Sequence, residues 1–202
     1  MKEELKLVGG ELTAARIQAA TKLKQALESE AHQLAMKGAI IEPTLEALTE
    51  PRSSGFERVE FLFSPNPGEI PRPMAKIASG GELSRLMLAI KQVLPEGDVP
   101  TLVFDEVDTG IGGATSELVG RKLKNVATRQ QVLCITHLPQ VAVFADQQLR
   151  VEKLVEGGRT STRISELDQS ERTREIARML AGSTVTDSAM KHATEMLAST
   201  AN

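Results

Sequence analysis

Three short polar segments hold the residues of this sequence that could do chemistry. The first is Ser79-Gly80-Gly81-Glu82, which opens an apolar-periodic stretch running to residue 94. Ser79 can accept a hydrogen bond from the backbone N–H of Glu82, whose side chain can reach back, so the segment fits a helix capping box. Two glycines also allow a backbone to approach a ligand closely, and the N–H groups and dipole at a helix start favour a phosphate. Both interpretations stay open on these residues alone.

The second segment is Asp105-Glu106, directly after the apolar run "TLVF". A strand of a parallel sheet ends at the ligand crevice, so two carboxylates at its tip can divide the work. Asp105 could hold Mg²⁺, directly or through water. Glu106 could polarise a water molecule for attack on a phosphorus atom. The alternative is a solvated acidic turn with no chemical role.

The third segment is Thr136-His137, at the end of the apolar run "QVLCIT". A neutral imidazole at the same sheet edge could hydrogen-bond a γ-phosphate or the attacking water. The alternative is an ordinary polar loop histidine. Metal binding by histidine is not expected, because His32 and His192 fall in unrelated predicted helices and the sequence has no Cys/His ligand spacing.

The hydrophobic pattern predicts helices and strands that would position these segments. Runs 101–105 and 131–136 are continuous and apolar, as in strands buried on both faces of a parallel sheet. A hairpin is expected around Gly157-Gly158, with strands over 148–155 and 159–165. Asp168 with Glu171 fits an N-cap, and Gly182 fits a helix stop. Helices are expected over residues 82–94, 114–127, 169–180 and 186–199.

The N-terminal part is predicted to be a helix followed by a weakly patterned stretch. Over residues 11–36 a heptad-like stripe indicates either a coiled-coil segment or an amphipathic helix packed on its own domain. Gly9-Gly10 should interrupt any extension towards Met1. Residues 37–57 show only a short helix near 44–49, residues 58–64 alternate like a strand, and the proline-rich stretch 65–73 predicts an extended surface loop. The stripe consists of Ile17, Ala20, Lys24, Leu27, Ala31 and Leu34.

The composition of the chain limits the classes of partner that it is expected to bind. The net charge is −3 and aromatic residues make up 2%, with no Trp and no Tyr. A freestanding duplex-DNA binder is usually basic, and a single-strand binder uses aromatic stacking, so this chain alone should not be the main DNA contact. The single cysteine, Cys134, is expected to be a buried strand residue and fits a reducing cytoplasm. No apolar run is long enough to span a membrane, and no membrane partner is expected.

Taken in order, the three segments resemble the C-terminal lobe of ABC-type ATPase heads, as signature motif, Walker B strand and switch histidine. In detail, "ASGGELSRLMLAIK", "VFDEVDTGIGG" and "ITHLPQVA" closely resemble the RecN family of bacterial SMC-like DNA repair ATPases. "NPGEIPRPMAKIASGGELSR" resembles that family too. The similarity runs from about residue 11 to about residue 198, and three motifs in the right order make it specific.

The resemblance implies an α/β fold, the C-terminal lobe of an ABC/SMC-type P-loop ATPase head, with a largely parallel sheet flanked by helices. Residues 1–40 would be the end of a coiled-coil arm, and residues 41–202 the lobe. The P-loop, G-x-x-x-x-G-K-[ST], is not found in the 202 residues and would come from an N-terminal lobe of the same protein. A nucleoid-associated cytoplasmic protein that contacts DNA through its full length is expected.

The resemblance also implies roles for the site residues. Ser79, Gly80, Gly81 and Glu82 would contact the γ-phosphate of ATP held by a second head, closing a sandwich of two heads around two nucleotides. For the nucleotide of their own head, Asp105 would bind Mg²⁺, and Glu106 and His137 would be catalytic.

Some positions depart from the general ABC pattern. Many ABC heads have Leu before the signature serine, where this chain has Ala78, and an Asp six residues after the catalytic Glu, where it has Gly112. The D-loop role is therefore not transferred to Asp108, and the Q-loop glutamine is unassigned.

Two other functions stay open: a different ABC-class ATPase, such as a transporter subunit or another SMC relative, and a non-catalytic module that only pairs with another chain. In the main interpretation, the isolated chain should hydrolyse ATP negligibly because it lacks the phosphate cradle and lysine of a P-loop. It should also leave a sheet edge or apolar face uncovered and self-associate.

Overall fold

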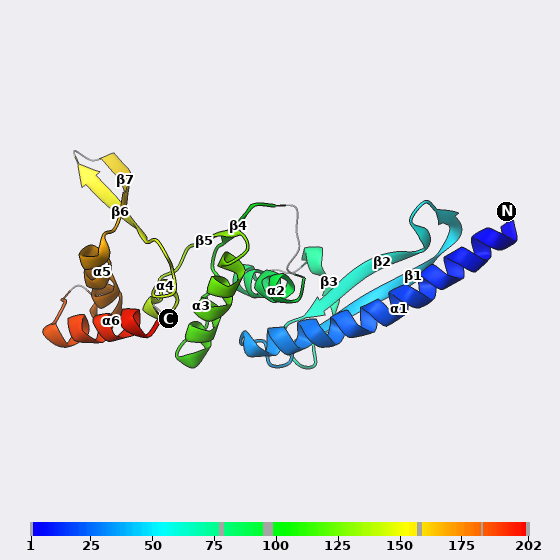
Figure 1. Cartoon of the computed structure of the whole chain (residues 1–202), viewed down its shortest axis with the longest axis horizontal. Coiled ribbons are helices and arrows are strands. Elements are labelled where there is room, and N and C mark those ends of the chain that lie inside the picture. The colour runs from blue at the N-terminus through cyan, green and yellow to red at the C-terminus, as the bar shows by residue number, and fades with distance from the viewer. Residues whose placement is uncertain (1, 77–78, 95–98, 157–158, 183, 201–202) are drawn as a thin grey trace. The chain divides into compact units, whose positions relative to one another are not determined.

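The computed structural model describes residues 2–76, 79–94, 99–156, 159–182 and 184–200 (Figure 1). The chain divides into two compact units, Met1–Asp98 and Val99–Asn202. Helices and strands are mixed in both, which confirms the predicted α/β class. None of the helices in these ranges is both long enough and apolar enough to cross a membrane.

The first unit is a long helix packed on an antiparallel sheet. Strand order is β1-β2-β3, and β1 and β2 form a hairpin whose short turn requires antiparallel pairing. Leu27 of α1, Ile41 of β1 and Phe63 of β2 are buried in the core of this unit. Its elements are α1 (Lys2–Gln33), β1 (Ile40–Arg52), β2 (Gly55–Ser64), β3 (Arg72–Pro73), the 3-10 helix η1 (Met74–Lys76) and α2 (Gly80–Val93).

The predicted N-terminal helix exists, but the expected interruption at Gly9-Gly10 is wrong. Helix α1 continues through both glycines to Lys2. A Cβ atom at Gly9 would lie 2.1 Å from Cε2 of Phe56, so the glycine makes room for an aromatic ring of β2. Contact with β2, which adds stability that a lone helix lacks, offsets the low helix propensity of glycine.

The predicted short helix near residues 44–49 is also wrong, because this stretch belongs to β1. Its residues pair in register with β2, for example Leu45 with Val59. β1 lies at the edge of the sheet, where Pro43 is tolerated because one side of the strand needs no ladder hydrogen bond. Pairing with a distant strand therefore overrides the weak local preference. The strand predicted over 58–64 is confirmed as part of β2.

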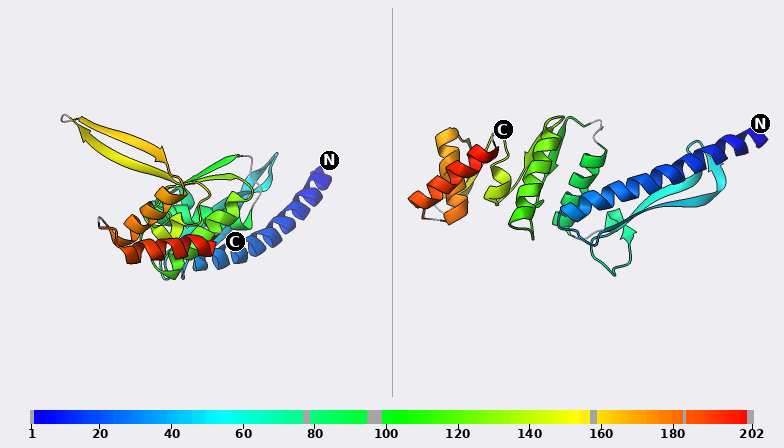
Figure 2. Two further views of the ribbon diagram at one scale, coloured as in Figure 1. Left: turned by 60° about the vertical axis from the view of Figure 1, so that its left-hand side comes forward. Right: turned by 60° about the horizontal axis from the view of Figure 1, so that its bottom comes forward.

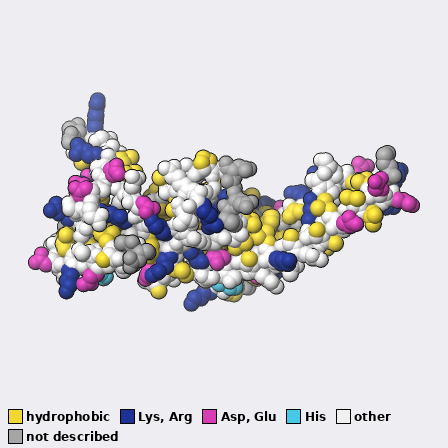
Figure 3. Space-filling view, in the orientation of Figure 1, with side chains coloured by type: hydrophobic (Ala, Val, Ile, Leu, Met, Phe, Trp, Pro, Cys, Tyr) yellow, Lys and Arg dark blue, Asp and Glu magenta, His cyan; other side chains and the backbone are white. Residues whose placement is uncertain are grey.

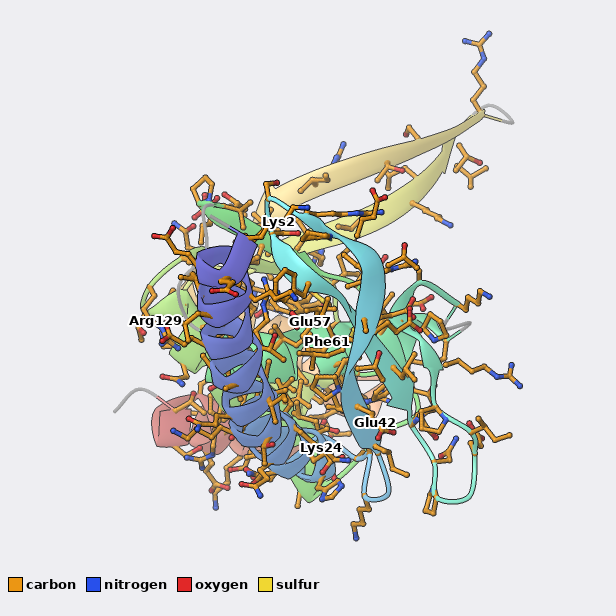
Figure 4. All side chains as sticks on the ribbon, turned by 90° about the vertical axis from the view of Figure 1, so that its right-hand side faces the viewer. Lys2, Lys24, Glu42, Glu57, Phe61 and Arg129 are labelled. Atoms are coloured by element: carbon orange, nitrogen blue, oxygen red, sulfur yellow. The ribbon has the colours of Figure 1, made fainter. Side chains whose placement is uncertain are left out.

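A polar brace fastens the β1–β2 hairpin to α1. Glu57 accepts a hydrogen bond from Thr13 and another, of 3.0 Å, from Nη1 of Arg16. Figure 4 shows Glu57 between the helix and the strands. The hydrogen bond from Thr13, helped by Arg16, lowers the pKa of the Glu57 carboxyl below its ordinary value. The carboxylate therefore stays ionised and holds the hairpin against α1.

The second unit joins a parallel β-α-β element to a hairpin and two C-terminal helices. β4 and β5 pair in parallel through the crossover helix α3. β6 and β7 form an antiparallel hairpin that extends away from α5 and α6 (Figure 2). The elements are β4 (Thr101–Phe104), α3 (Ala114–Ala127), β5 (Gln131–Cys134), α4 (Pro139–Ala142), β6 (Leu149–Glu156), β7 (Arg159–Glu166), α5 (Gln169–Ala181) and α6 (Asp187–Thr200).

Local signals predicted this unit well. α3 has the predicted bounds, and the hairpin and both C-terminal helices are present within a residue or two of their predicted ends. Asp168 and Glu171 form the expected capping box, and Gly182, at φ 78°, ends α5. Gly157 and Gly158 lie outside the described residues. Packing of α5 and α6 forms a core of Ala142, Val143, Ile176, Ala177 and Ala193.

The strand pair β4–β5 differs from the prediction in its burial. The expected largely parallel sheet is not found among the described strands, because only the β4–β5 pair is parallel and the other pairings are antiparallel. Phe104 is buried, but Val103, Leu133 and Ile135 on the opposite face are 65%, 47% and 60% exposed. Burial on both faces is therefore wrong for this pair within its own unit, because no described element of the second unit covers that second face. The prediction that an apolar face would be left uncovered is confirmed.

Candidate active site

Two loops at one edge of the β4–β5 pair hold most of the chemistry-bearing residues. Because the strands are parallel and Phe104 pairs with Cys134, both strands end at the same edge. The backbone N–H of Ile135 donates to the Phe104 carbonyl at 2.9 Å and extends the pairing by one residue. Asp105-Glu106 follows β4 and Thr136-His137 follows β5, so the structure brings these two predicted segments to one place.

The loop after β4 turns sharply at Glu106. Its φ angle is +56°, in the left-handed region that residues with a side chain rarely adopt. The Glu106 carbonyl accepts a hydrogen bond of 3.0 Å from the N–H of Thr109, which closes the turn. Asp105 and Glu106 are both exposed. A strained glutamate at a strand tip is typical of positions where function fixes the residue type.

A buried carboxylate, Asp108, joins the two loops. It is 2% exposed, and its Oδ2 accepts hydrogen bonds from the hydroxyl of Thr136 and, at 3.0 Å, from the backbone N–H of His137. Nδ1 of the His137 ring lies 3.2 Å from the same oxygen. A buried charge requires such partners, so this cluster fixes the loop after β5 against the loop after β4.

Sequence reasoning set Asp108 aside because it does not occupy the usual D-loop position. The available signal was a third acidic residue at a strand end that faces a neighbouring strand ending in Thr-His. Periodicity could not reveal its burial, because its partners lie in the loop after β5, in another part of the sequence.

Cys134 is the last residue of β5. It is half-buried, whereas the sequence predicted a buried strand residue. Burial, followed by the negative charges of Asp108 and Asp105, raises the pKa of its thiol to about 12. The thiol is therefore protonated near neutral pH, and Cys134 is not a candidate nucleophile.

The Ser79 segment belongs to the first unit, where it begins α2. Ser79 is the N-cap, and its Oγ accepts a hydrogen bond of 3.4 Å from the N–H of Glu82. Ser79 and Gly80 are exposed, whereas Gly81 is buried. The predicted capping by Ser79 is thus confirmed, and the first N–H groups of a helix still have no intrahelical acceptor. Ala78 lies outside the described residues.

Arg85 lies one turn further along α2 and is buried. Burial lowers the pKa of its guanidinium, while the charge of Glu82 acts in the opposite sense. The helix that begins at Ser79 thus contains a buried, positively charged side chain.

The residues fit magnesium only as a partly hydrated ion. Among the described side chains, no cluster of three or more His, Cys, Asp or Glu residues could hold a metal ion. Mg²⁺ is commonly bound by one or two carboxylates together with waters and substrate phosphates. The hard oxygen ligand of Asp105, exposed at a strand tip, fits that coordination.

Comparison with known proteins gives a consistent result. No family model matches the chain. DNA repair protein RecN of Haemophilus influenzae is 45% identical over 198 residues, which is 96% of this chain and 35% of that protein. RecN of Deinococcus radiodurans is 47% identical over 195 residues, 96% of this chain and 34% of that protein. The chain thus spans about a third of the length of these curated relatives.

Solved structures with a similar fold are Smc heads. The Smc head domain with a coiled coil and joint from Pyrococcus yayanosii has a TM-score of 0.56 at 16% identity, over 86% of this chain and 32% of that one. The Smc head domain with an extended coiled coil from Pyrococcus furiosus, bound to the C-terminal domain of ScpA, has a TM-score of 0.50 at 19% identity, over 87% and 42%. The chain therefore has the fold of part of an Smc head and corresponds in sequence to the C-terminal part of the RecN DNA repair proteins.

Proposed function

We propose that this chain forms the C-terminal lobe of the ATP-hydrolysing head of an SMC-like DNA repair protein. The observation that carries the proposal is the meeting of Asp105-Glu106 and His137 at one sheet edge, fixed by the hydrogen bonds of Asp108. An N-terminal lobe with a P-loop, from the same protein, completes the site. The full-length protein acts in the cytoplasm on DNA, in double-strand-break repair and recombination.

In this proposal the exposed loop residues divide the work at the nucleotide. Asp105 binds Mg²⁺, which supplies charge neutralisation on the phosphates when bound. Glu106 accepts a proton from the attacking water, and the strained turn holds its backbone in place. His137 hydrogen-bonds at the reacting centre.

The Ser79 segment serves the nucleotide of a second head. Ser79, Gly80, Gly81 and Glu82 stand at the positive end of α2, a helix long enough for its dipole to favour an anion. Two heads then close around two ATP molecules, and hydrolysis releases them.

The N-terminal residues 1–40 are proposed to be the end of a coiled-coil arm, with residues 41–202 as the lobe. Leu5, Val8 and Leu12 are exposed on α1 at spacings of three and four residues, the pattern that a partner helix covers. Figure 3 shows hydrophobic side chains following α1 and the strands packed on it.

The test is Glu106→Gln in the full-length protein. The amide keeps the size of the side chain but cannot accept the proton, so ATP turnover should fall at least about 100-fold. Association of heads driven by ATP, measured by light scattering, should persist because binding is kept. Glu117→Gln, a surface glutamate of α3 paired with Arg121, is the matched control and should leave turnover unchanged.

Unchanged hydrolysis in Glu106→Gln would refute the assigned base. If wild-type protein associated on ATP but never hydrolysed it, the chain would instead be a non-catalytic pairing module.

The isolated chain should hydrolyse ATP negligibly, since the P-loop sequence is not found in it. The measurement is phosphate release from purified chain with Mg²⁺ and ATP. A turnover of about 1 per second or more, the usual range for enzymes, would contradict the need for a second lobe.

A further inference from the structure

The β6–β7 hairpin turns its apolar face away from the rest of the second unit. Directly paired residues of an antiparallel sheet share one face, so Val151 and Ile164 lie on the same face as Leu149 and Val155. These four side chains are 64%, 63%, 56% and 72% exposed, respectively. An antiparallel sheet that is covered on one side ordinarily packs its apolar face on the core. Here the apolar face is the one left open within the unit.

The opposite face of the hairpin is mainly polar, and it is the face that is partly covered. All the half-buried side chains of the two strands lie on it, namely Arg150, Glu152, Leu154 and Ser165. Nη2 of Arg150 donates a hydrogen bond of 2.7 Å to Glu152 on the same face. The polarity of the hairpin is thus the reverse of what burial in its own unit would favour.

Charges at the base of the hairpin favour this orientation. The hydrogen bond to Glu152 raises the pKa of the Arg150 guanidinium, and the negative charge of Glu175 in α5 acts in the same sense. The hydrogen bonds to Glu175 raise the pKa of Arg178, and the charge of Glu152 adds to them. Opposite charges on β6 and α5 therefore attract each other, which keeps the polar face towards α5 and the apolar face outward.

We propose that the apolar face of the β6–β7 hairpin is the docking surface for an earlier part of the full-length protein, the N-terminal lobe with the P-loop. The identity of this lobe rests on the proposed function. The chain corresponds to the C-terminal part of its RecN relatives and spans 35% and 34% of two of them, so most of each relative precedes the matched region. The docking part must present apolar side chains, because polar groups would lose water on this face without gaining partners.

The size of the surface favours an occupant from the same polypeptide. It offers four apolar side chains, whereas a stable complex between separate proteins buries about 1,200–2,000 Å². A covalently linked segment does not lose its translational freedom on docking, so a smaller surface is sufficient. The hairpin also gains from a cover, because a two-stranded sheet is only marginally stable by itself and β6 and β7 have no other partner among the described strands.

The test compares thiol labelling of the isolated chain and of the full-length protein, without nucleotide. Val151→Cys places a thiol on the apolar face, and iodoacetamide labelling of that peptide is followed by mass spectrometry. Labelling should be at least about tenfold slower in the full-length protein, because a covered thiol reacts only when the surface opens. Ser161→Cys is the matched control, since Ser161 is exposed on the polar face of β7. Its labelling rate should agree within about twofold between the two proteins.

Equal labelling of Val151→Cys in the isolated chain and the full-length protein would overturn the proposal. Protection that disappears when the full-length protein is diluted would overturn it as well, because the occupant would then be a second copy. Hydrogen exchange of the wild type needs no variant: the β6 and β7 amides should exchange at least about tenfold more slowly in the full-length protein, and equal exchange would count against docking.

ATP turnover of the full-length protein separates this inference from the proposed function. If ATP is hydrolysed but Val151→Cys is labelled equally in both proteins, the docking surface is wrong and the proposed function stands. If Val151→Cys is protected but the wild type never hydrolyses ATP, the hairpin docks as proposed and the catalytic assignment fails.

Discussion

At the scale of single residues, the site combines strain with burial. Glu106 adopts a left-handed backbone conformation that costs a residue with a side chain on the order of 1–2 kcal/mol. The Asp108 carboxylate is buried, and the Thr136 hydroxyl and the His137 N–H of the neighbouring loop donate hydrogen bonds to it. Neither feature is needed to build a turn, and glycine would serve better at position 106. Both are explained if the carboxylates at these positions have a chemical task.

The strain at Glu106 predicts an unusual order of stabilities. Glu106→Gly should be more stable than Glu106→Ala by roughly 1 kcal/mol, because only glycine adopts a positive φ without strain. Glu117, within the helix α3, provides the control, since there the alanine variant should be the more stable by about 1 kcal/mol. Urea unfolding followed by circular dichroism measures both pairs. Finding the same order at the two positions would contradict the strained turn.

Cys134 predicts a dependence of stability on pH. Its pKa is raised from 9.0 to about 12 in the folded chain, chiefly by burial, so folding favours the protonated thiol. The stabilisation is complete below the unfolded pKa and is lost as the pH rises from about 9 through about 12. The free energy of unfolding of the wild type should therefore fall more steeply over this range than that of Cys134→Ala.

Alkylation of the thiol checks the same shift directly. Iodoacetamide at pH 8.5 should modify Cys134 at least about tenfold more slowly in the folded chain than in urea, because only the thiolate reacts. Equal rates in the folded chain and in urea would show that the thiol is not buried and that its pKa is not raised.

At the scale of elements, α1 depends on the hairpin that packs along it. Phe56 fills the space above Gly9, and Thr13 and Arg16 hold Glu57. Gly10, the neighbouring residue, has nothing within 4 Å of the position where a Cβ would lie. Two adjacent glycines of one helix therefore have different roles, one set by packing and one without a packing requirement.

These glycines form a matched pair for mutation. Gly10→Ala should stabilise the chain by up to about 1 kcal/mol through helix propensity. Gly9→Ala gains the same propensity but displaces the Phe56 ring, and it should destabilise by about 1–2 kcal/mol overall. Thermal or urea unfolding measures both. In a Phe56→Ala background the clash is gone, so Gly9→Ala should become stabilising by up to about 1 kcal/mol, like Gly10→Ala. Equal stabilisation by the two alanines would argue against ring packing at Gly9.

At the scale of the whole molecule, the second unit presents an apolar surface that water does not favour. Val103, Leu133 and Ile135 lie on one face of the β4–β5 pair, and each of these strands pairs with a single described strand. An exposed apolar face next to open strand edges is a common site of association. In the proposed full-length head, further strands and helices of the N-terminal lobe would cover it.

The isolated chain should therefore self-associate in a concentration-dependent way, as sedimentation velocity would detect. Replacing Val103 and Ile135 by Thr should shift the chain towards monomer, since it removes much of the apolar face. Val59→Thr, an exposed valine of β2 in the first unit, is the control and should leave the distribution unchanged. A compact wild-type monomer at all concentrations would contradict this prediction.

The sequence by itself determined the features that depend on neighbours within a turn or two of the chain. Caps, turns and hydrophobic periodicity located α2, α3, α5 and the β6–β7 hairpin, and the polar residues after two apolar runs marked Asp105, Glu106 and His137. Only the tertiary structure decided that residues 44–49 form a strand, that α1 continues through Gly9, and that Asp108 joins the two loops. Those features depend on partners far along the chain: β2, Phe56 and the loop after β5. These contacts join residues that are far apart in the sequence and form only when the chain folds. The sequence therefore carries no periodic pattern that reveals them.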